Sequence, residues 1–421
     1  MNSESLANHV TSVPPGALDG LRVIDLTHAL AGPFCTMVLA DLGADVLKVE
    51  PLHGDGTRKM GPFAPDDAIK AFGGYFNSVN RNKRSIVIDL QQPEGKAILR
   101  RLIAGADVLV ENYRAGVMDR LGFSFESLHA EFPRLVYACV RGFGDPRTGD
   151  ASVPESPYAA WPAFDVVAQA MGGLTGVTGP GPEQPMNAGA PMGDLGPALF
   201  AAVGILAAVR HAEHTGRGQL IDVAMYDGVL ALCERIIYLH SYTGVVAGPV
   251  GAGNPQICPF DAFPTRDGWV TIAAPGERHW GYLCDIIGRP ELGTDPGYAT
   301  NAARVQRANE VRQIVRDWTT SQTTAEVVEV LGGIVPCGPI NTVEDILADP
   351  HVARRQMIAH VEQPGSGTPV AIANSPVKMT ETPGTVRRRA PLLGEHTDDV
   401  LLGLGFGEAA IAALRSQGRI L

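Results

Sequence analysis

Short β-branched runs alternate with helix-like stretches through the first third of the chain, and this alternation limits the fold more than any other feature. The expected strands lie at 21–26, 45–50, 85–89, 107–111 and 135–141, and the expected helices between them include 33–42 and 92–104. Strands that alternate with helices predict a parallel sheet covered on both faces. Pro33 and Pro93 both fit the first turn of a helix, where a missing N–H costs nothing. The sequence therefore predicts the α/β class.

The length of 421 residues exceeds the ~100–200 residues of one ordinary core, which favours two domains. Composition changes along the chain predict where they lie. We expect a polar N-terminal arm at 1–20, the first part of a large domain at 21–243, a Gly- and Pro-rich linker or active-site loop at 244–260, a smaller α+β domain at 261–350 and a return segment at 351–421. The return segment is too short to fold alone, so we expect it to complete the large domain.

Several kinds of protein are disfavoured by composition. The most apolar run, Leu195–Val209, is shorter than the roughly 20 residues that cross a bilayer, which favours a buried helix and no membrane partner. The six cysteines are isolated, without metal-ligand spacing or a dense disulfide pattern, and this favours a reducing cytoplasm. The N-terminal arm has no apolar h-region typical of a secretory signal.

The formal charge of −11 argues against nucleic acid as a partner, because phosphate binding needs a clustered positive surface. It does not exclude an anionic small molecule, which needs only a few cations. Basic residues gather at 81–84 and at Arg114 and Arg120. On charge alone these clusters fit either an anion site or a solvated charged face.

Asp194 stands out because it directly precedes the strongest predicted helix, at the end of the segment 189–194. One interpretation is a helix N-cap. The other is a carboxylate nucleophile that the positive end of the helix keeps ionised. The residues around Asp194 do not choose between the two.

Several blocks spread along the chain occur in the same order as in a known family. They are LRVIDL at 21–26, AGP at 31–33, ADLGADVLKVE at 40–50, NRNKRS at 80–85, VENY at 110–113, RLG at 120–122, TGRGQ at 215–219, IVPCGP at 334–339 and APLLGEHT at 390–397. With these blocks the chain resembles the class III coenzyme A transferases over nearly its whole length. The resemblance implies a Rossmann-like large domain built from both chain ends, a small domain between them and an interlocked homodimer.

The family's catalytic aspartate falls on Asp194, in the context Gly189-x-x-x-Gly193-Asp194. The resemblance implies that this carboxylate attacks an acyl-CoA to give a mixed anhydride and then an aspartyl-CoA thioester, which an acceptor acid resolves. Coenzyme A is then a substrate, together with carboxylate small molecules, and no metal or other prosthetic group is expected.

For coenzyme A, the matching positions are Ala29, Asn112, Tyr113 and Arg120. Arg120 could contact phosphate, Tyr113 could pack on adenine, and the Asn112 amide offers both a donor and an acceptor. Ordinary surface or helix-cap roles explain these residues equally well. Leu30 stands where the family often has Gln, so this chain lacks an amide that could contact reaction intermediates.

The substrate region is less defined. Gly251 and Gly253 match a mobile loop over the active site, or else a flexible interdomain linker. The blocks DLT at 25–27, LAGPF at 30–34 and GDGTR at 54–58 most resemble transferases that use succinyl-CoA and other short dicarboxylic acids. A second carboxylate would need a cation in the pocket. Arg58 is one candidate for that role, and a purely structural role is the alternative interpretation.

Two alternatives to a transferase stay open. Racemases of branched acyl-CoAs share this fold and use a histidine in a Gly-His-Asp segment, where this chain has Ala163-Phe164-Asp165. Proton exchange needs an acid and a base on opposite faces of the carbon, and Phe164 supplies neither, so the transferase is favoured. A non-catalytic CoA-binding protein is the second alternative, which the presence of Asp194 disfavours.

Overall fold

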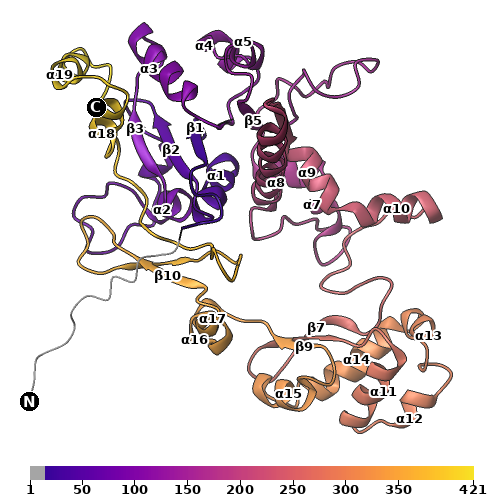
Figure 1. Cartoon of the computed structure of the whole chain (residues 1–421). Coiled ribbons are helices and arrows are strands. Elements are labelled where there is room, and N and C mark those ends of the chain that lie inside the picture. The colour runs from indigo at the N-terminus through magenta and orange to yellow at the C-terminus, as the bar shows by residue number, and fades with distance from the viewer. Residues whose placement is uncertain (1–14) are drawn as a thin grey trace, which may run out of the picture. The chain divides into compact units, whose positions relative to one another are not determined.

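A six-stranded parallel sheet forms the centre of the larger part of the molecule in the computed structural model, which describes residues 15–421 (Figure 1). The order is β3-β2-β1-β4-β5-β6, and all five neighbouring pairs are parallel. The strands are β1 (Arg22–Asp25), β2 (Asp45–Glu50), β3 (Arg84–Val87), β4 (Val108–Glu111), β5 (Val136–Arg141) and β6 (Leu220–Ala224). The predicted α/β class with a parallel sheet is confirmed. The strand order reverses between β1 and β4, and such reversals are where doubly wound sheets bind ligands.

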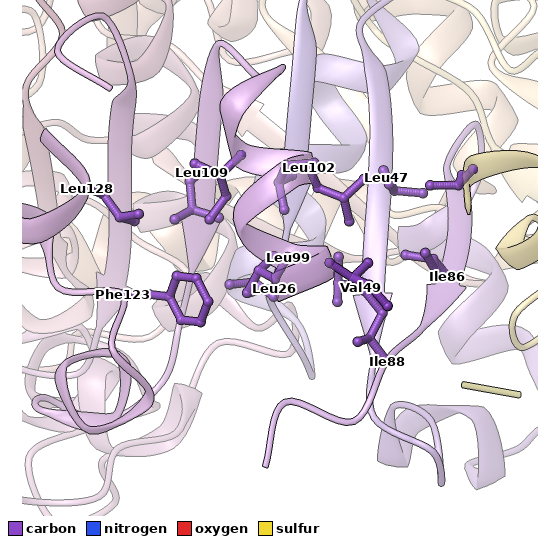
Figure 2. Close-up of a cluster of buried hydrophobic side chains, with 14 of the residues drawn as sticks. Leu26, Leu47, Val49, Ile86, Ile88, Leu99, Leu102, Leu109, Phe123 and Leu128 are labelled. Atoms are coloured by element: carbon purple, nitrogen blue, oxygen red, sulfur yellow. The ribbon is translucent and has the colours of Figure 1, made fainter. Parts of the chain in front are cut away.

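One face of the sheet packs on α3 (Pro93–Ala104), whose Leu99 and Leu102 lie among Leu47, Val49 and Leu109 of the strands (Figure 2). Residues two apart along a strand share a face, so Leu47 and Val49 both reach this cluster. The C-terminal helices α18 (Thr397–Gly403) and α19 (Glu408–Ser416) add further side chains to the same core. The end of the chain therefore helps to close the core that its beginning starts.

The neighbouring strand positions face α1 (Ala31–Asp41), where Asp25 accepts a hydrogen bond from Thr36 Oγ1 at 2.7 Å. The long helix α8 (Met192–Thr215) packs against α1, β5 and β6, and against α6 (Asp165–Met171) and α9 (Met225–Leu232). Its buried residues are mostly glycine and alanine, which allow close approach of its neighbours.

The helix α8 is longer than the apolar run that the sequence marked. Its 24 residues would suffice, by length and composition, to cross a membrane, with a mean hydropathy of 1.8 in its most apolar window. A single helix of this kind is weak evidence for a span, since core helices pass the same test. The packing of α8 on the sheet and three helices favours the core helix that we expected.

Shorter elements complete this part of the chain. They are the 3-10 helix η1 (Gly56–Lys59), the helices α2 (Gly74–Asn80), α4 (Val117–Leu121), α5 (Phe125–Glu131) and α17 (Pro350–Arg354), and the antiparallel pair β10 (Ile358–Val361) and β11 (Val370–Ala373).

Another part of the chain has its own core around a three-stranded antiparallel sheet, β7 (Phe260–Pro264), β8 (Trp269–Ala273) and β9 (Cys337–Pro339). Its helices are α7 (Leu174–Val177), α10 (Glu234–Thr243), α11 (Glu277–Ile286), α12 (Glu291–Thr294), α13 (Asn301–Gln306), α14 (Ala308–Thr319), α15 (Thr324–Leu331) and α16 (Val343–Ala348). Trp280 and Arg304 are both fully buried here, with the guanidinium 5.2 Å from the indole centre. Arg304 is satisfied by backbone carbonyls, including Cys258 O at 2.7 Å.

The chain thus divides into two units. Unit 1 contains the described residues up to Gly172, Gly189–Glu234 and Ala353–Leu421, and unit 2 contains Gly173–Ala188 and Arg235–Val352. Two segments of the expected large domain lie in unit 2, which also contains the expected linker at 244–260. The turn after Gly172 and nearly all of α10 belong to unit 2, where the Gly251 N–H donates to Gly179 O at 2.8 Å. Long-range contacts of this kind leave no mark in local composition.

The expected N-terminal arm lies partly outside the described residues, which begin at residue 15. The part at 15–20 is held in place, because the Leu18 N–H donates to Leu42 O at 3.0 Å. Gly16 lies so close to the turn after α1 that a Cβ there would be 2.3 Å from Leu42 O. Residues 15–20 of the expected arm are therefore anchored to the turn after α1.

We expect the Leu99→Ala substitution to lower the unfolding free energy of unit 1 by about 2–5 kcal/mol, because it opens a cavity in a fully buried core. Urea unfolding followed by circular dichroism measures this change. The matched control is Leu402→Ala on α18, where the side chain is 46% exposed, with an expected effect below about 1 kcal/mol. Equal effects of the two substitutions would contradict the packing shown in Figure 2.

Candidate functional site

A cavity of about 1040 Å³ lies at the carboxyl ends of β1 to β4, where the strand order of the sheet reverses. Every segment that follows one of these strands contributes to its wall. The lining includes 26–29 after β1, 48–57 at the end of β2 and beyond, 88–91 after β3, and Tyr113, Val117, Arg120 and Leu121 after β4. A volume of this size admits a ligand with a nucleotide part.

Three of the four residues expected to bind coenzyme A, namely Ala29, Tyr113 and Arg120, line this one cavity. Ala29 has a φ of 64°, a left-handed conformation that a non-glycine residue adopts at a cost. The Tyr113 ring lies 5.3 Å from the ring of His28, centre to centre. The Arg120 side chain is exposed. The structure thus brings these residues together across β1 and β4.

Asn112 has a different role from the expected one. Its Nδ2 donates to His28 O at 2.7 Å, and its Oδ1 accepts from the His28 N–H at 2.9 Å. Both functions of the amide are therefore used by the backbone of the loop after β1. Asn112 fixes the strained loop at Ala29 and does not line the cavity, which corrects the prediction of a direct CoA contact.

Sequence reasoning missed Lys96, which also lines the cavity from the second turn of α3. Among residues 15–421, neither Lys96 nor Arg120 forms an ion pair within 4 Å, so both remain available to an anion. At the start of α3 the N-cap Gln92 makes no side-chain cap hydrogen bond to the first turn. Pro93 did indicate this helix start in the sequence, but not which strand ends lie beside it.

A buried charge network supports the floor of the cavity. Asp25 pairs with Lys83 at 2.9 Å, and Lys48 pairs with Asp55 at 3.1 Å. Lys48 also donates to Thr27 O at 2.7 Å, which ties β2 to the loop after β1. Burial alone would raise the pKa of Asp25, but Lys83 and Lys48 hold it well below its usual range. Burial lowers the pKa of Lys83 to about 8 in spite of its partner.

Asp194 lies in the first turn of α8, and the N-cap of that helix is Pro191. The interpretation of Asp194 as an N-cap is therefore wrong. Burial, together with the charge of Asp165, raises the pKa of Asp194 to about 7. The helix dipole was expected to favour the ionised form, but desolvation and a neighbouring carboxylate outweigh it. A carboxylate this easily protonated is typical of a functional site.

Asp165 holds the start of α8 from the side. Its Oδ1 accepts from the Gly193 N–H at 2.7 Å, and its Oδ2 accepts from Gln169 Nε2 at 2.8 Å. A Cβ at position 193 would lie 2.4 Å from Asp165 O, so only glycine allows α6 and α8 to meet here. This close approach explains why a glycine directly precedes Asp194. Phe164, the N-cap of α6, is 72% exposed and offers no titratable group.

Tyr75 on α2 is a second residue that the sequence did not single out. Burial and the charges of Asp194 and Asp55 raise its pKa to about 12. The phenol is thus within electrostatic reach of Asp194 and also of Asp55, a residue of the cavity wall. It stays protonated at neutral pH and can donate a hydrogen bond. Tyr75 therefore lies in the electrostatic field of both Asp194 and Asp55, two residues far apart in the sequence.

Arg58 does not have the role that we expected. Its Nε and Nη2 both donate to the Glu50 carboxylate, at 2.7 and 2.6 Å, and its Nη1 donates to Pro391 O at 2.9 Å. The guanidinium also lies 3.9 Å from the Phe76 ring centre. With only 4% of the residue exposed, Arg58 joins the return segment to β2 and is held away from a substrate carboxylate.

The remaining predicted residues are placed as follows. Leu30 is the N-cap of α1, partly buried, next to Ala29 of the cavity wall. Gly251 has a φ of 77°, and Gly253 lies against the ion pair of Arg312 with Asp261, both within unit 2. Their role as a loop over the active site stays a prediction. Within residues 15–421, no group of three His, Cys, Asp or Glu residues is arranged to hold a metal ion.

Comparison with known proteins decides the family. The model of CoA-transferase family III matches residues 18–397. The chain belongs to this family. A succinyl-CoA:mesaconate CoA-transferase from Haloarcula hispanica is 45% identical over 392 residues, which is 93% of this chain and 97% of that protein. A formyl-CoA:oxalate CoA-transferase from Streptomyces coelicolor is 39% identical over 426 residues, 96% of this chain and 99% of that protein.

A solved structure agrees with this family III assignment. The crystal structure of a CAIB/BAIF family protein from Brucella suis matches with a TM-score of 0.81 and 33% identity, over 93% of this chain and all of that one. The protein is thus a CoA-transferase, as the blocks of its sequence indicated.

The raised pKa of Asp194 predicts how stability depends on pH. The folded state holds a proton on Asp194 up to about pH 7, whereas an unfolded chain releases it near pH 4. The stability that this proton contributes is present at low pH and is lost as the pH rises from about 4 through about 7. We therefore expect Asp194→Asn to gain stability relative to wild type over this interval, by about 1 kcal/mol or more.

Thermal or urea unfolding of both proteins at pH 4.5 and pH 8 measures the difference. Asp165→Asn serves as the matched background, because it removes the second carboxylate but keeps an acceptor for the Gly193 N–H. In that background the pH-dependent gain should shrink. A gain that is independent of pH would contradict a raised pKa at Asp194.

Proposed function

We propose that this CoA-transferase moves CoA from succinyl-CoA, or another short dicarboxylyl-CoA, to a carboxylic acid through covalent intermediates on Asp194. The observation that carries the proposal is the position of Asp194, a poorly solvated carboxylate with a pKa near 7 that shares Tyr75 with the wall of the CoA cavity. The dicarboxylate preference rests on the names of relatives, which act on mesaconate and on oxalate.

The reaction begins with attack by an Asp194 oxygen on the thioester carbon. The C–S bond breaks, which gives a mixed anhydride and the CoA thiolate. The thiolate then attacks the Asp194 acyl carbon, which releases the first acid as a carboxylate and leaves an aspartyl-CoA thioester. An acceptor carboxylate attacks this thioester and the two steps run in reverse, so no net proton is consumed.

The surroundings of Asp194 suit these steps. A partly desolvated carboxylate is a stronger nucleophile than one in water, because its charge is less well stabilised before attack. The Asp165 carboxylate also disfavours a resting negative charge on Asp194. The Tyr75 hydroxyl is within electrostatic reach of Asp194 and can donate a hydrogen bond to the oxygen that becomes negative during attack.

Coenzyme A is proposed to occupy the cavity at the ends of β1 to β4. Its phosphate groups would face the cations Arg120 and Lys96 and the free N–H groups at the start of α3. Its adenine would pack on Tyr113, which lies beside the strained loop at Ala29. Gly251 and Gly253 of unit 2 are proposed to belong to a loop that excludes water from the intermediates. We place the reaction in the cytoplasm.

We expect Asp194→Ala to bind CoA but to lose transfer from succinyl-CoA to mesaconate by at least about 1,000-fold, since no other group can carry the acyl intermediate. Product formation measured by chromatography tests this. In the wild type, succinyl-CoA followed by borohydride should inactivate the enzyme by reducing the aspartyl thioester. Mass spectrometry should then locate the modification at residue 194.

The control for this experiment is Arg58→Lys, which keeps the charge beside Glu50 and should retain transfer if Arg58 is structural. Near-wild-type transfer by Asp194→Ala would remove the proposed mechanism. A racemase would instead exchange the α-proton of a 2-methylacyl-CoA with deuterated water. Rapid α-deuteration without CoA exchange would favour that alternative. A wild-type protein that binds CoA but has neither activity would favour a non-catalytic protein.

The chain is also proposed to form a homodimer, interlocked as the family resemblance implies. On α8 the apolar side chains Leu199, Phe200 and Val203 are 49%, 42% and 66% exposed. Val203 lies four residues after Leu199 and three after Phe200, so the three side chains share one side of the helix. In a single chain they are in contact with water. A second copy would bury them.

We expect light scattering to show a dimer that persists at nanomolar concentration. Val203→Asp should weaken the dimer or prevent its assembly, because it places a charge in an apolar contact. Val166→Asp, at a residue 52% exposed on α6, is the matched control and should leave the mass unchanged. A folded monomer in the wild type would contradict the proposal.

A further inference from the structure

A second cavity of about 420 Å³ lies in unit 1 and shares no lining residue with the CoA cavity. The return segment builds nearly all of its wall. The lining consists of Lys83 and of residues 360–362, 386–389, 391, 395 and 396. Three consecutive arginines, Arg387 to Arg389, fall within this short stretch. Neither the proposed transfer reaction nor coenzyme A binding uses any of them.

The three arginines differ in how they are neutralised. Arg389 holds Glu395 through two bonds of 2.9 Å. Arg387 and Arg388 have no carboxylate within 4 Å among residues 15–421. Lys83, the other cation of the wall, is already committed to Asp25. The cavity therefore contains two guanidinium groups whose charges no carboxylate neutralises.

The hydrogen bonding of these two groups is also incomplete. Arg387 Nη1 donates to Asp41 O at 3.1 Å, but its Nη2 is buried and has no hydrogen-bond partner within the described residues. Arg388 donates from Nε to Asn82 O at 3.2 Å. Its two terminal nitrogens form no hydrogen bond within the described residues 15–421. The donors open to a ligand are therefore the two terminal nitrogens of the exposed Arg388, and Arg387 contributes its charge beside them.

The remaining polar groups of the wall fit the same ligand chemistry. Burial and the nearby charges of Arg84 and Arg387 lower the pKa of Arg388, against the opposite effect of the carboxylates of Asp45 and Glu395. His396 Nδ1 accepts from the Ser85 N–H at 3.2 Å, which leaves the proton on Nε2 as a further donor. Burial lowers the pKa of His396, so this ring is neutral at pH 7. Glu362, at the rim, is exposed.

We propose that this cavity is a second binding site, for a small divalent oxyanion, with Arg388 and Arg387 as its ligands. The ligand class is phosphate or a short dicarboxylate. Two unpaired guanidiniums match a dianion in charge, and their planar donors match the spacing of carboxylate and phosphate oxygens. A single halide ion would neutralise only one of them, and a volume of about 420 Å³ leaves room for several heavy atoms.

Isothermal titration of the full-length protein, with the CoA cavity saturated by coenzyme A, tests the proposal. Inorganic phosphate and succinate are titrated separately at constant ionic strength. We expect one site per chain for at least one of the two dianions, and the tighter of the two identifies the source of the ligand. Sodium chloride in place of the dianion should give no saturable heat.

The variant Arg388→Gln should weaken dianion binding about tenfold or more, because it removes a charge-assisted bond of roughly 1.5–3 kcal/mol. Arg388 is exposed at the surface of the fold, so the variant should unfold at the wild-type temperature. Arg388→Lys should bind with intermediate affinity, since it keeps the charge but loses the second donor. Arg415→Gln, which removes an exposed arginine paired with Asp398 elsewhere in the return segment, is the control and should bind like wild type.

Three results would overturn the proposal. They are no binding of either dianion to the CoA-saturated protein, wild-type affinity in a folded Arg388→Gln variant, and equal weakening by Arg415→Gln, which would indicate general charge screening only. None of these results depends on transfer activity. The anion site and the proposed mechanism at Asp194 can therefore fail independently.

Discussion

The buried carboxylate of Asp25 is the interaction on which the larger unit depends. It ends β1, pairs with Lys83 at 2.9 Å beside β3, and accepts from Thr36 of α1. A buried charge is tolerated only when it is paired and hydrogen-bonded, so these partners must come together for the sheet to form. Removing Lys83 alone would leave Asp25 charged in a site without water. The same network reaches the CoA cavity through Lys48, which holds the loop after β1.

The reversal of strand order between β1 and β4 creates the cavity beside this network. The Asn112 amide fixes the conformation of the loop after β1, which lines the cavity. Both hydrogen bonds of that amide go to the His28 backbone, which supports the unfavourable φ of Ala29. The strain is thus compensated by a neighbouring strand. A loop fixed in this way can approach a ligand closely without first becoming ordered, which reduces the entropic cost of binding.

Several segments of the chain together set the surroundings of Asp194. Gly193 allows α6 to pack against α8, Asp165 then lies beside Asp194, and α2 brings Tyr75 within reach of both Asp194 and the cavity wall. Each segment alone carries little information about chemistry. Together they raise the pKa of the Asp194 carboxyl group to about 7, so that this group is poorly solvated when it ionises.

The sequence by itself determined the parallel sheet, because alternating apolar runs and helices leave few other arrangements, and β2 has the predicted limits. It also identified the family, since ordered motifs can be read without knowledge of contacts, and it singled out Asp194 as the residue for which we propose catalysis. Only the tertiary structure decided what surrounds them. Arg58 is the clearest case: a basic residue in a matching motif, it is held by Glu50 and by a carbonyl 333 residues away. Tyr75, Lys96 and the second cavity at Arg388 likewise arise where distant segments meet. Local sequence cannot predict them, because pairing, burial and pKa depend on neighbours that are close only in the folded chain.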